Sequence, residues 1–188
     1  MLPSATLALH SSTFRRRVSL GVLLLLALLQ GCAHDRRTIG SMVDDSAVEL
    51  KATGLLTTDP TYRDAHINAT SVNGILLLSG EAPTAEVRDS MLTNIRNIPS
   101  IRRIVNEVRV APPSTFSQRS RDAWITGKVK SRLIGTRGLR AGRVNVITEN
   151  TSVFLMGLVT QQESELATNA ATNVSGIERV VKLFEYVD

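Results

Sequence analysis

The chain has 188 residues, of which 43% are hydrophobic and 4% aromatic, a composition typical of one ordinary globular domain or two small ones. Its formal net charge is +5, but residues 1–31 hold three of the 22 basic residues, and we expect this segment to be removed. The mature chain would keep 19 basic against 17 acidic residues, so the isoelectric point near 10.0 overstates its basicity. The single cysteine excludes an internal disulfide, a cysteine-based zinc cluster and a redox pair.

The N-terminus has the layout of a secretory signal peptide. Three arginines, Arg15 to Arg17, precede a twelve-residue apolar run from Val18 to Leu29. A run of that length is too short for a stable membrane-spanning helix, which needs about 20 apolar residues. The sequence therefore predicts a segment, residues 1–31, that directs export and is then cleaved off.

The only cysteine, Cys32, directly follows this signal. The letters LQGC that end at Cys32 resemble the lipobox of bacterial lipoproteins. The resemblance implies that Cys32 carries a diacylglyceryl thioether, becomes the mature N-terminus and is N-acylated, and several acyl chains anchor a protein almost permanently. Ala33, where inner-membrane lipoproteins typically have aspartate, favours the periplasmic leaflet of the outer membrane. The alternative is an ordinary secreted protein with a chance cysteine. Residues 32–44 are expected to form a tether.

An internal repeat sets the architecture of the mature chain. Residues 45–80 align without a gap with residues 122–157 at an offset of 77, and after a one-residue deletion the match continues towards the C-terminus. Two copies of about 66 residues follow from this alignment.

Each copy is predicted to open with a short helix and a hairpin. Apolar residues at helical spacing follow Asp45 and Asp122, which stand where helix N-caps would be. Alternating residues then predict two strands around a tight turn, at residues 71–74 and 148–151.

A second helix and a last strand complete each copy. The second helices are expected over residues 84–98 and 161–174, and the last strands over residues 101–110 and 177–187. The order is α-β-β-α-β, twice. Prolines and polar residues in the segment between the copies predict a short, semi-stiff linker over residues 112–121, which should keep the copies in contact.

Both copies resemble the BON domain. The letters INATSVNGILLLSGEA and IPSIRRIVNEV carry the resemblance in the first copy, and VNVITENTSVFLMGLV and VSGIERVVKLF carry it in the second. The second copy departs from the pattern at Thr151, where the turn glycine is usual, and at Lys182, where asparagine is usual; the first has Pro99-Ser100 in place of a small residue and glycine. The resemblance implies an α+β fold in which two helices cover a small mixed sheet, with domains at residues 45–111 and 122–188.

A lipobox followed by two such domains is similar to the dual-BON outer-membrane lipoproteins associated with division and outer-membrane stress. That resemblance implies an anionic phospholipid membrane as the partner and a role in envelope integrity.

No catalytic or metal-binding set stands out in the sequence. The mature histidines are His34, in the tether, and His66, at the start of a strand in the first copy only. We interpret His66 as an edge residue rather than a ligand. Glu163 and Glu165 fall on different helix faces and are expected to be solvated. The sequence therefore predicts no catalytic residue, no metal, no cofactor and no small-molecule substrate.

The opening helices of the two copies differ in charge, with a net −2 in the first and +3 in the second. Together with the following loop, residues 119–143 hold eight basic residues and one acidic residue. A helical wheel at about 100° per residue places Trp124, the only tryptophan, about 140° from the centre of the core stripe. Its counterpart in the first copy is Ala47.

We interpret this face of the second copy as a membrane interface. Indole rings suit the membrane-water boundary, and cations there pair with anionic headgroups at about 1 kcal/mol each. The predicted lipid-binding residues are Arg121, Trp124, Lys128, Lys130, Arg132, Arg137 and Arg140. Two alternatives for Trp124 stay open, which are packing between the two domains and contact with a protein partner.

The sequence thus predicts a non-enzymatic outer-membrane lipoprotein whose second domain binds anionic phospholipid from the periplasmic side. The alternative is a tethered adaptor or chaperone-like factor for an outer-membrane assembly machine or the cell wall. Nucleic acid is not expected as a partner, because the signal peptide directs the chain to a compartment without it.

Overall fold

The computed structural model describes residues 38–187. The predicted signal peptide, Cys32 and the first part of the expected tether lie outside these residues. The elements of the first domain are α2 (Ile39–Thr58), β1 (His66–Val72), β2 (Ile75–Ala82), α3 (Ala85–Ile95) and β3 (Arg103–Val110). Those of the second domain are α4 (Phe116–Gly135), β4 (Asn145–Glu149), β5 (Ser152–Val159), α5 (Gln161–Thr172) and β6 (Arg179–Tyr186).

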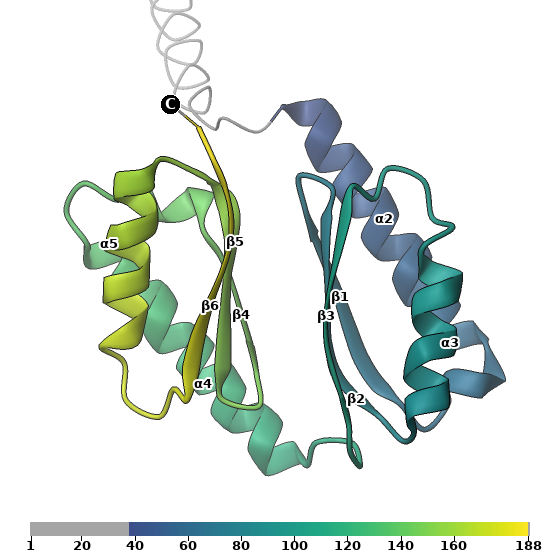
Figure 1. The fold of residues 1–188 in the computed structure, drawn as a ribbon. Helices are drawn as coiled ribbons and strands as arrows, with labels where there is room; N and C mark the ends of the chain where they lie inside the picture. Colours follow the sequence, from purple (N-terminus) through teal and green to yellow (C-terminus); the bar gives the residue numbers. More distant parts are fainter. Residues whose placement is uncertain (1–37, 188) are drawn as a thin grey trace, which may run out of the picture. The chain divides into compact units, whose positions relative to one another are not determined.

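Each domain is a three-stranded mixed sheet with two helices on one face (Figure 1). The sheet orders are β1-β2-β3 and β4-β5-β6, and the central strand pairs antiparallel with its hairpin partner and parallel with the last strand. The predicted α+β fold and the predicted element order are therefore confirmed in both copies.

The predicted N-caps of the opening helices are wrong. Helix α2 is capped by Thr38, whose side chain accepts a hydrogen bond from the Ser41 amide. Helix α4 is capped by Thr115, which forms a reciprocal capping box with Gln118. Both helices have 20 residues and start 77 positions apart, so the repeat extends to their first residues. The helices occupy the end of the expected tether and six of the ten residues of the expected linker.

The aspartates expected as N-caps instead hold the hairpin turns. The buried carboxylate of Asp45 accepts hydrogen bonds from the backbone amides of Asn73 and Gly74, at 2.7 and 2.8 Å. Asp122 accepts from the amides of Asn150 and Thr151, at 2.8 and 2.9 Å. One carboxylate in the second turn of each helix therefore fixes the hairpin against that helix.

Two glycines are required because another backbone segment passes very close to each of them. A Cβ atom on Gly80 would lie 2.0 Å from the carbonyl oxygen of His66, and one on Gly157 would lie 2.1 Å from that of Arg143. No side chain fits at these distances. The glycine that ends each hairpin motif is therefore needed for the β1-β2 and β4-β5 pairing.

Each domain has a hydrophobic core between its sheet and its helices, and a third cluster joins the domains. In β2, Leu76 and Leu78 pack towards α2 and α3, whereas Ile75 and Leu77 belong to the joining cluster. Residues from both sheets form that cluster, namely Val72, Ile75, Leu77, Phe154, Met156 and Leu183. The second face of each sheet is thus covered by the other domain, and the predicted contact between the copies is confirmed.

Candidate functional site

Helix α4 presents the candidate site on the face opposite its core contacts. Ile125, Val129 and Leu133 are buried in the core of the second domain. Trp124 is 52% exposed, and the Lys128 Nζ atom lies 5.1 Å from the centroid of its ring, within the range of a cation–π contact. The predicted outward orientation of Trp124 is confirmed.

The alternative in which Trp124 packs between the domains is wrong. The cluster that joins the two sheets is built from strand residues and does not include Trp124. Trp124 instead lines a shallow hollow on the outside of the second domain, between α4 and the turn before β6. The other residues of the hollow are Arg121, Ile125, Ser175 and Gly176.

The six predicted cationic residues of the site are all exposed. Four lie on α4 and two on the loop that follows it: Arg121, Lys128, Lys130, Arg132, Arg137 and Arg140. Within residues 38–187, none of the six takes part in an ion pair with an acidic side chain. Their charge is therefore available to an anionic partner.

The other two basic residues of the segment do not belong to this surface. Arg143 is buried, and its Nη1 atom lies 3.2 Å from Glu163 Oε1. The expectation that Glu163 is solvated is thus wrong, because it pairs with Arg143 and also closes a capping box with Thr160 at the start of α5. Arg119 donates a hydrogen bond to the backbone carbonyl of Ser114.

Two apolar side chains at the ends of α4 were not among the predicted site residues. Phe116 and Ile134 are large, exposed hydrophobic residues on the same helix as Trp124. The predicted linker includes Phe116. The Thr115–Gln118 capping box is the sequence signal that α4 begins before Asp122.

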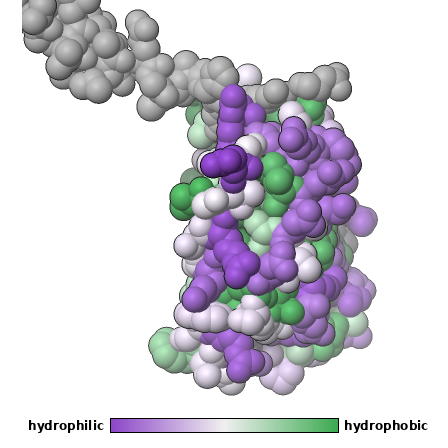
Figure 2. Space-filling view, turned by 90° about the vertical axis from the view of Figure 1, so that its left-hand side faces the viewer, coloured by the Kyte–Doolittle hydropathy of each residue, from purple (hydrophilic) through white to green (hydrophobic). Residues whose placement is uncertain are grey.

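Figure 2 shows the side of the molecule that carries α5, where small hydrophobic areas lie among hydrophilic residues.

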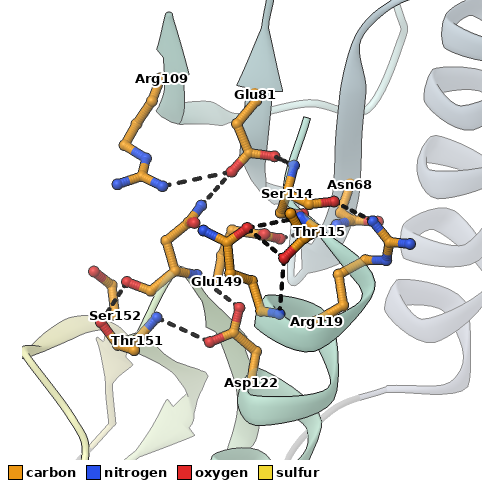
Figure 3. Close-up of polar contacts among 12 residues, drawn as sticks. Asn68, Glu81, Arg109, Ser114, Thr115, Arg119, Asp122, Glu149, Thr151 and Ser152 are labelled. Atoms are coloured by element: carbon orange, nitrogen blue, oxygen red, sulfur yellow. Dashed lines mark hydrogen bonds and ion pairs between the residues drawn. The ribbon is translucent and has the colours of Figure 1, made fainter. Parts of the chain in front are cut away.

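A polar cluster crosses from the first domain to the second (Figure 3). Glu81, which is buried, accepts hydrogen bonds from the Asn150 side chain and from the Ser114 amide, and lies 3.5 Å from Arg109. Glu149 accepts a hydrogen bond from Asn68 Nδ2 at 3.0 Å. These contacts tie the hairpin of the second domain to the first domain and to the connector.

Burial raises the pKa of the Glu149 carboxyl above its ordinary value. The negative charges of Glu81 and Asp122 raise it further, whereas the hydrogen bond from Asn68 and the charge of Arg109 oppose the shift. The fold therefore disfavours the ionised form of Glu149.

We find no arrangement for metal-dependent chemistry in the described part of the chain. Among residues 38–187, no three His, Cys, Asp or Glu side chains lie where they could share a metal ion. His66 is half-buried at the start of β1. No helix within the same residues is long and apolar enough to span a bilayer.

Comparisons with known proteins identify two domains at the positions of the two copies. The BON domain model matches residues 44–112 and 121–188. The chain is 36% identical over 157 residues to outer membrane lipoprotein DolP of Haemophilus influenzae, covering 83% of this chain and 81% of that protein. It is 35% identical over 154 residues to the 21 kDa hemolysin of Actinobacillus pleuropneumoniae, covering 81% and 79%.

Similarity to solved structures is weaker. The C-terminal domain of CdsD, a type III secretion protein of Chlamydia trachomatis, aligns over 90% of this chain and 80% of its own. The identity is 16% and the TM-score 0.31, which is too low to bear on function.

Proposed function

Because the chain belongs to the BON-domain family and is an outer-membrane lipoprotein, we propose that it binds anionic phospholipid through α4 of its second domain. The chain acts in this proposal by binding rather than by catalysis, from the periplasmic side, in support of envelope integrity. Cys32 provides the lipid anchor, as its position after the signal peptide predicts.

A single observation carries the proposal: Trp124 is exposed and Lys128 lies over its ring. The cations around Trp124 form no ion pair with an acidic side chain of the described chain. An indole gains most where its ring meets acyl chains and its N–H meets water. Each neighbouring cation adds about 1 kcal/mol near an anionic surface. Phe116 and Ile134 extend the apolar contact along α4.

A protein partner is the second candidate for the same surface. Tryptophan and arginine are the residues that most often dominate protein interfaces, and Trp124 and Arg121 line one hollow. In this version the chain is a tethered adaptor for outer-membrane assembly or cell-wall proteins. The adaptor function requires no preference for anionic lipid.

Vesicle binding by the unlipidated protein separates the two candidates. We expect the mature chain carrying Cys32→Ser to bind phosphatidylglycerol vesicles and to dissociate from them at high salt. Its binding to phosphatidylcholine vesicles should be much weaker. Lys128→Glu changes the charge by two and should weaken binding by about tenfold or more, on the basis of 1 kcal/mol per charge. Lys51→Glu, at the matching exposed position of α2, is the control and should bind as the unmodified chain does.

Trp124→Ala tests the indole itself. It should weaken vesicle binding while the thermal unfolding midpoint stays nearly unchanged, because removing a buried tryptophan would cost about 3–5 kcal/mol and this one is half exposed. Unchanged binding in both Trp124→Ala and Lys128→Glu would contradict the lipid proposal and favour the adaptor.

A further inference from the structure

Helix α2 of the first domain has a second apolar face that packs on nothing in the described chain. Ile39 is 82% and Leu50 75% exposed, and Met42 and Val43 are exposed as well. These residues are spaced i, i+3, i+4 and i+11, so they fall on one line along the helix. Below, they are called the α2 stripe.

The α2 stripe lies opposite the core face of the helix and contains no charge. Val48, Ala52 and Leu56 pack into the core of the first domain. The residues that lie between the stripe positions on the outer face, Ser46 and Ala47, are small and exposed. A helix that is apolar on two opposite faces has a partner for each of them.

Only the first position of the stripe is shared by the duplicated helix, where exposed Phe116 corresponds to Ile39. At the positions of Met42, Val43 and Leu50, helix α4 has Arg119, Ser120 and Gly127. The shared fold therefore does not require these apolar side chains, and they need an explanation specific to the first domain.

The anchor indicates what covers the stripe. Cys32 precedes Ile39 by seven residues, and a chain of that length spans at most about 24 Å even when fully extended. The start of α2 therefore stays within that distance of the bilayer that holds the acyl chains. The stripe itself is about 17 Å long, at 1.5 Å per helical residue.

We propose that α2 lies on the membrane to which Cys32 is anchored, with Ile39, Met42, Val43 and Leu50 in the boundary between headgroups and acyl chains. This inference rests on the lipid anchor of the proposed function and not on phospholipid binding by α4. The partner is the neutral, zwitterionic part of the bilayer, because the stripe carries no cation and Asp44 and Glu49 flank it. The contact depends on apolar burial and is therefore insensitive to salt.

The single cysteine allows a direct test in the intact mature chain. Cys32 is coupled to maleimide-bearing lipid in phosphatidylcholine vesicles that contain bromine-labelled lipid. In a Trp124→Phe background, Leu50→Trp places the only indole on the stripe, and Asn169→Trp places it on the exposed side of α5 as the control. We expect the emission of Leu50→Trp to shift to the blue and to be quenched at least about twofold more than that of the control, at low and high salt alike.

Adding Ile39→Ser and Val43→Ser should reduce the quenching of Leu50→Trp to the control level. Equal quenching of the two indoles would overturn the proposal. A blue shift without lipid quenching, or one that grows with protein concentration in the absence of vesicles, would mean that a second copy covers the stripe and would also overturn it. These vesicles contain no anionic lipid and the protein lacks Trp124, so the result does not depend on whether α4 binds phosphatidylglycerol.

Discussion

At the scale of single residues, the second hairpin turn has a side chain in a conformation that suits glycine. The turn Asn73-Gly74 has φ angles of 52° and 75°, and Asn150-Thr151 has 49° and 61°. Positive φ costs a residue with a side chain roughly 1–2 kcal/mol, and more for a β-branched one such as threonine. The sequence departure at Thr151 therefore leaves the turn geometry intact at an energetic cost.

Thr151→Gly should stabilise the second domain. Relief of the positive φ outweighs the extra freedom of glycine in the unfolded chain, so the free energy of unfolding should rise by about 0.5–1 kcal/mol. The reverse change in the first domain, Gly74→Thr, should lower it, because a Cβ there would also lie 2.9 Å from Arg102 Cδ. Denaturant unfolding of both variants checks the pair, and a loss of stability in Thr151→Gly would contradict the role given to φ.

Glu149 should make stability depend on pH. Its pKa is raised in the folded protein, so the native state binds more protons than the unfolded state just above the ordinary glutamate range. The contribution of Glu149 to the free energy of unfolding therefore rises as the pH falls through the raised pKa, and it is lost as the pH rises through that pKa. Glu149→Gln should increase stability at neutral pH and flatten the pH dependence just above the ordinary glutamate range. Melting curves of both proteins across that range measure the difference, and parallel curves would contradict the assignment.

At the scale of elements, the hairpin and its opening helix act as one unit because a single buried carboxylate joins them. Asp122→Ala would leave the amides of Asn150 and Thr151 without their acceptor and should lower the free energy of unfolding by about 3 kcal/mol. Asp122→Asn keeps one acceptor oxygen and should cost less. Asp44→Ala, at an exposed position of α2, is the control and should stay within about 0.5 kcal/mol in chemical denaturation. A similar small effect for Asp122→Ala would mean that the turn forms without the helix.

The sequence predicts every one of these helices and strands but places the starts of the two opening helices seven residues too late. The sequence favours a tether over residues 39–44 because the α2 stripe adds apolar residues on the wrong face for a single amphipathic pattern. The threonines at positions 38 and 115, one repeat apart, were the missed signal. The outward position of Trp124 was predictable because α4 has one clear core stripe, whereas the burial of Arg143 and Glu163 depends on a contact between α5 and a loop 20 residues away.

At the scale of the whole molecule, the cluster between the sheets means that neither domain buries both faces of its sheet by itself. The runs Ile75-Leu76-Leu77-Leu78 and Val153-Phe154-Leu155-Met156 are apolar at consecutive positions, which indicates strands buried on both faces. The sequence could not predict which strands of the two domains face each other, because no local pattern encodes such a pairing. The hydrogen bond between Asn150 and Glu81, 69 positions apart, could not be predicted for the same reason.

A fragment of residues 115–188 should fold cooperatively, since it retains its own core and helix cap, but with a lower unfolding midpoint than the mature chain. Phe154 and Met156, both buried in the full chain, would face water in the fragment. Replacing Phe154 by serine in the fragment should therefore cost much less than the same replacement in the mature chain, where it leaves a cavity between the domains. Circular dichroism on heating measures both, and a disordered fragment would show that the two copies share one core.

The connector between the domains also affects how they dissociate. Only residues 111–115 separate the end of β3 from the start of α4, and the Ser114 amide is held by Glu81. After an opening event, each sheet would meet its partner at an effective concentration of order millimolar or above, as expected for short linkers. An interface too weak to join two separate chains can thus stay closed within one chain, and openings should be brief and reversible. Cleavage within residues 111–115 would make the association of the two domains bimolecular, so the domains would separate on dilution.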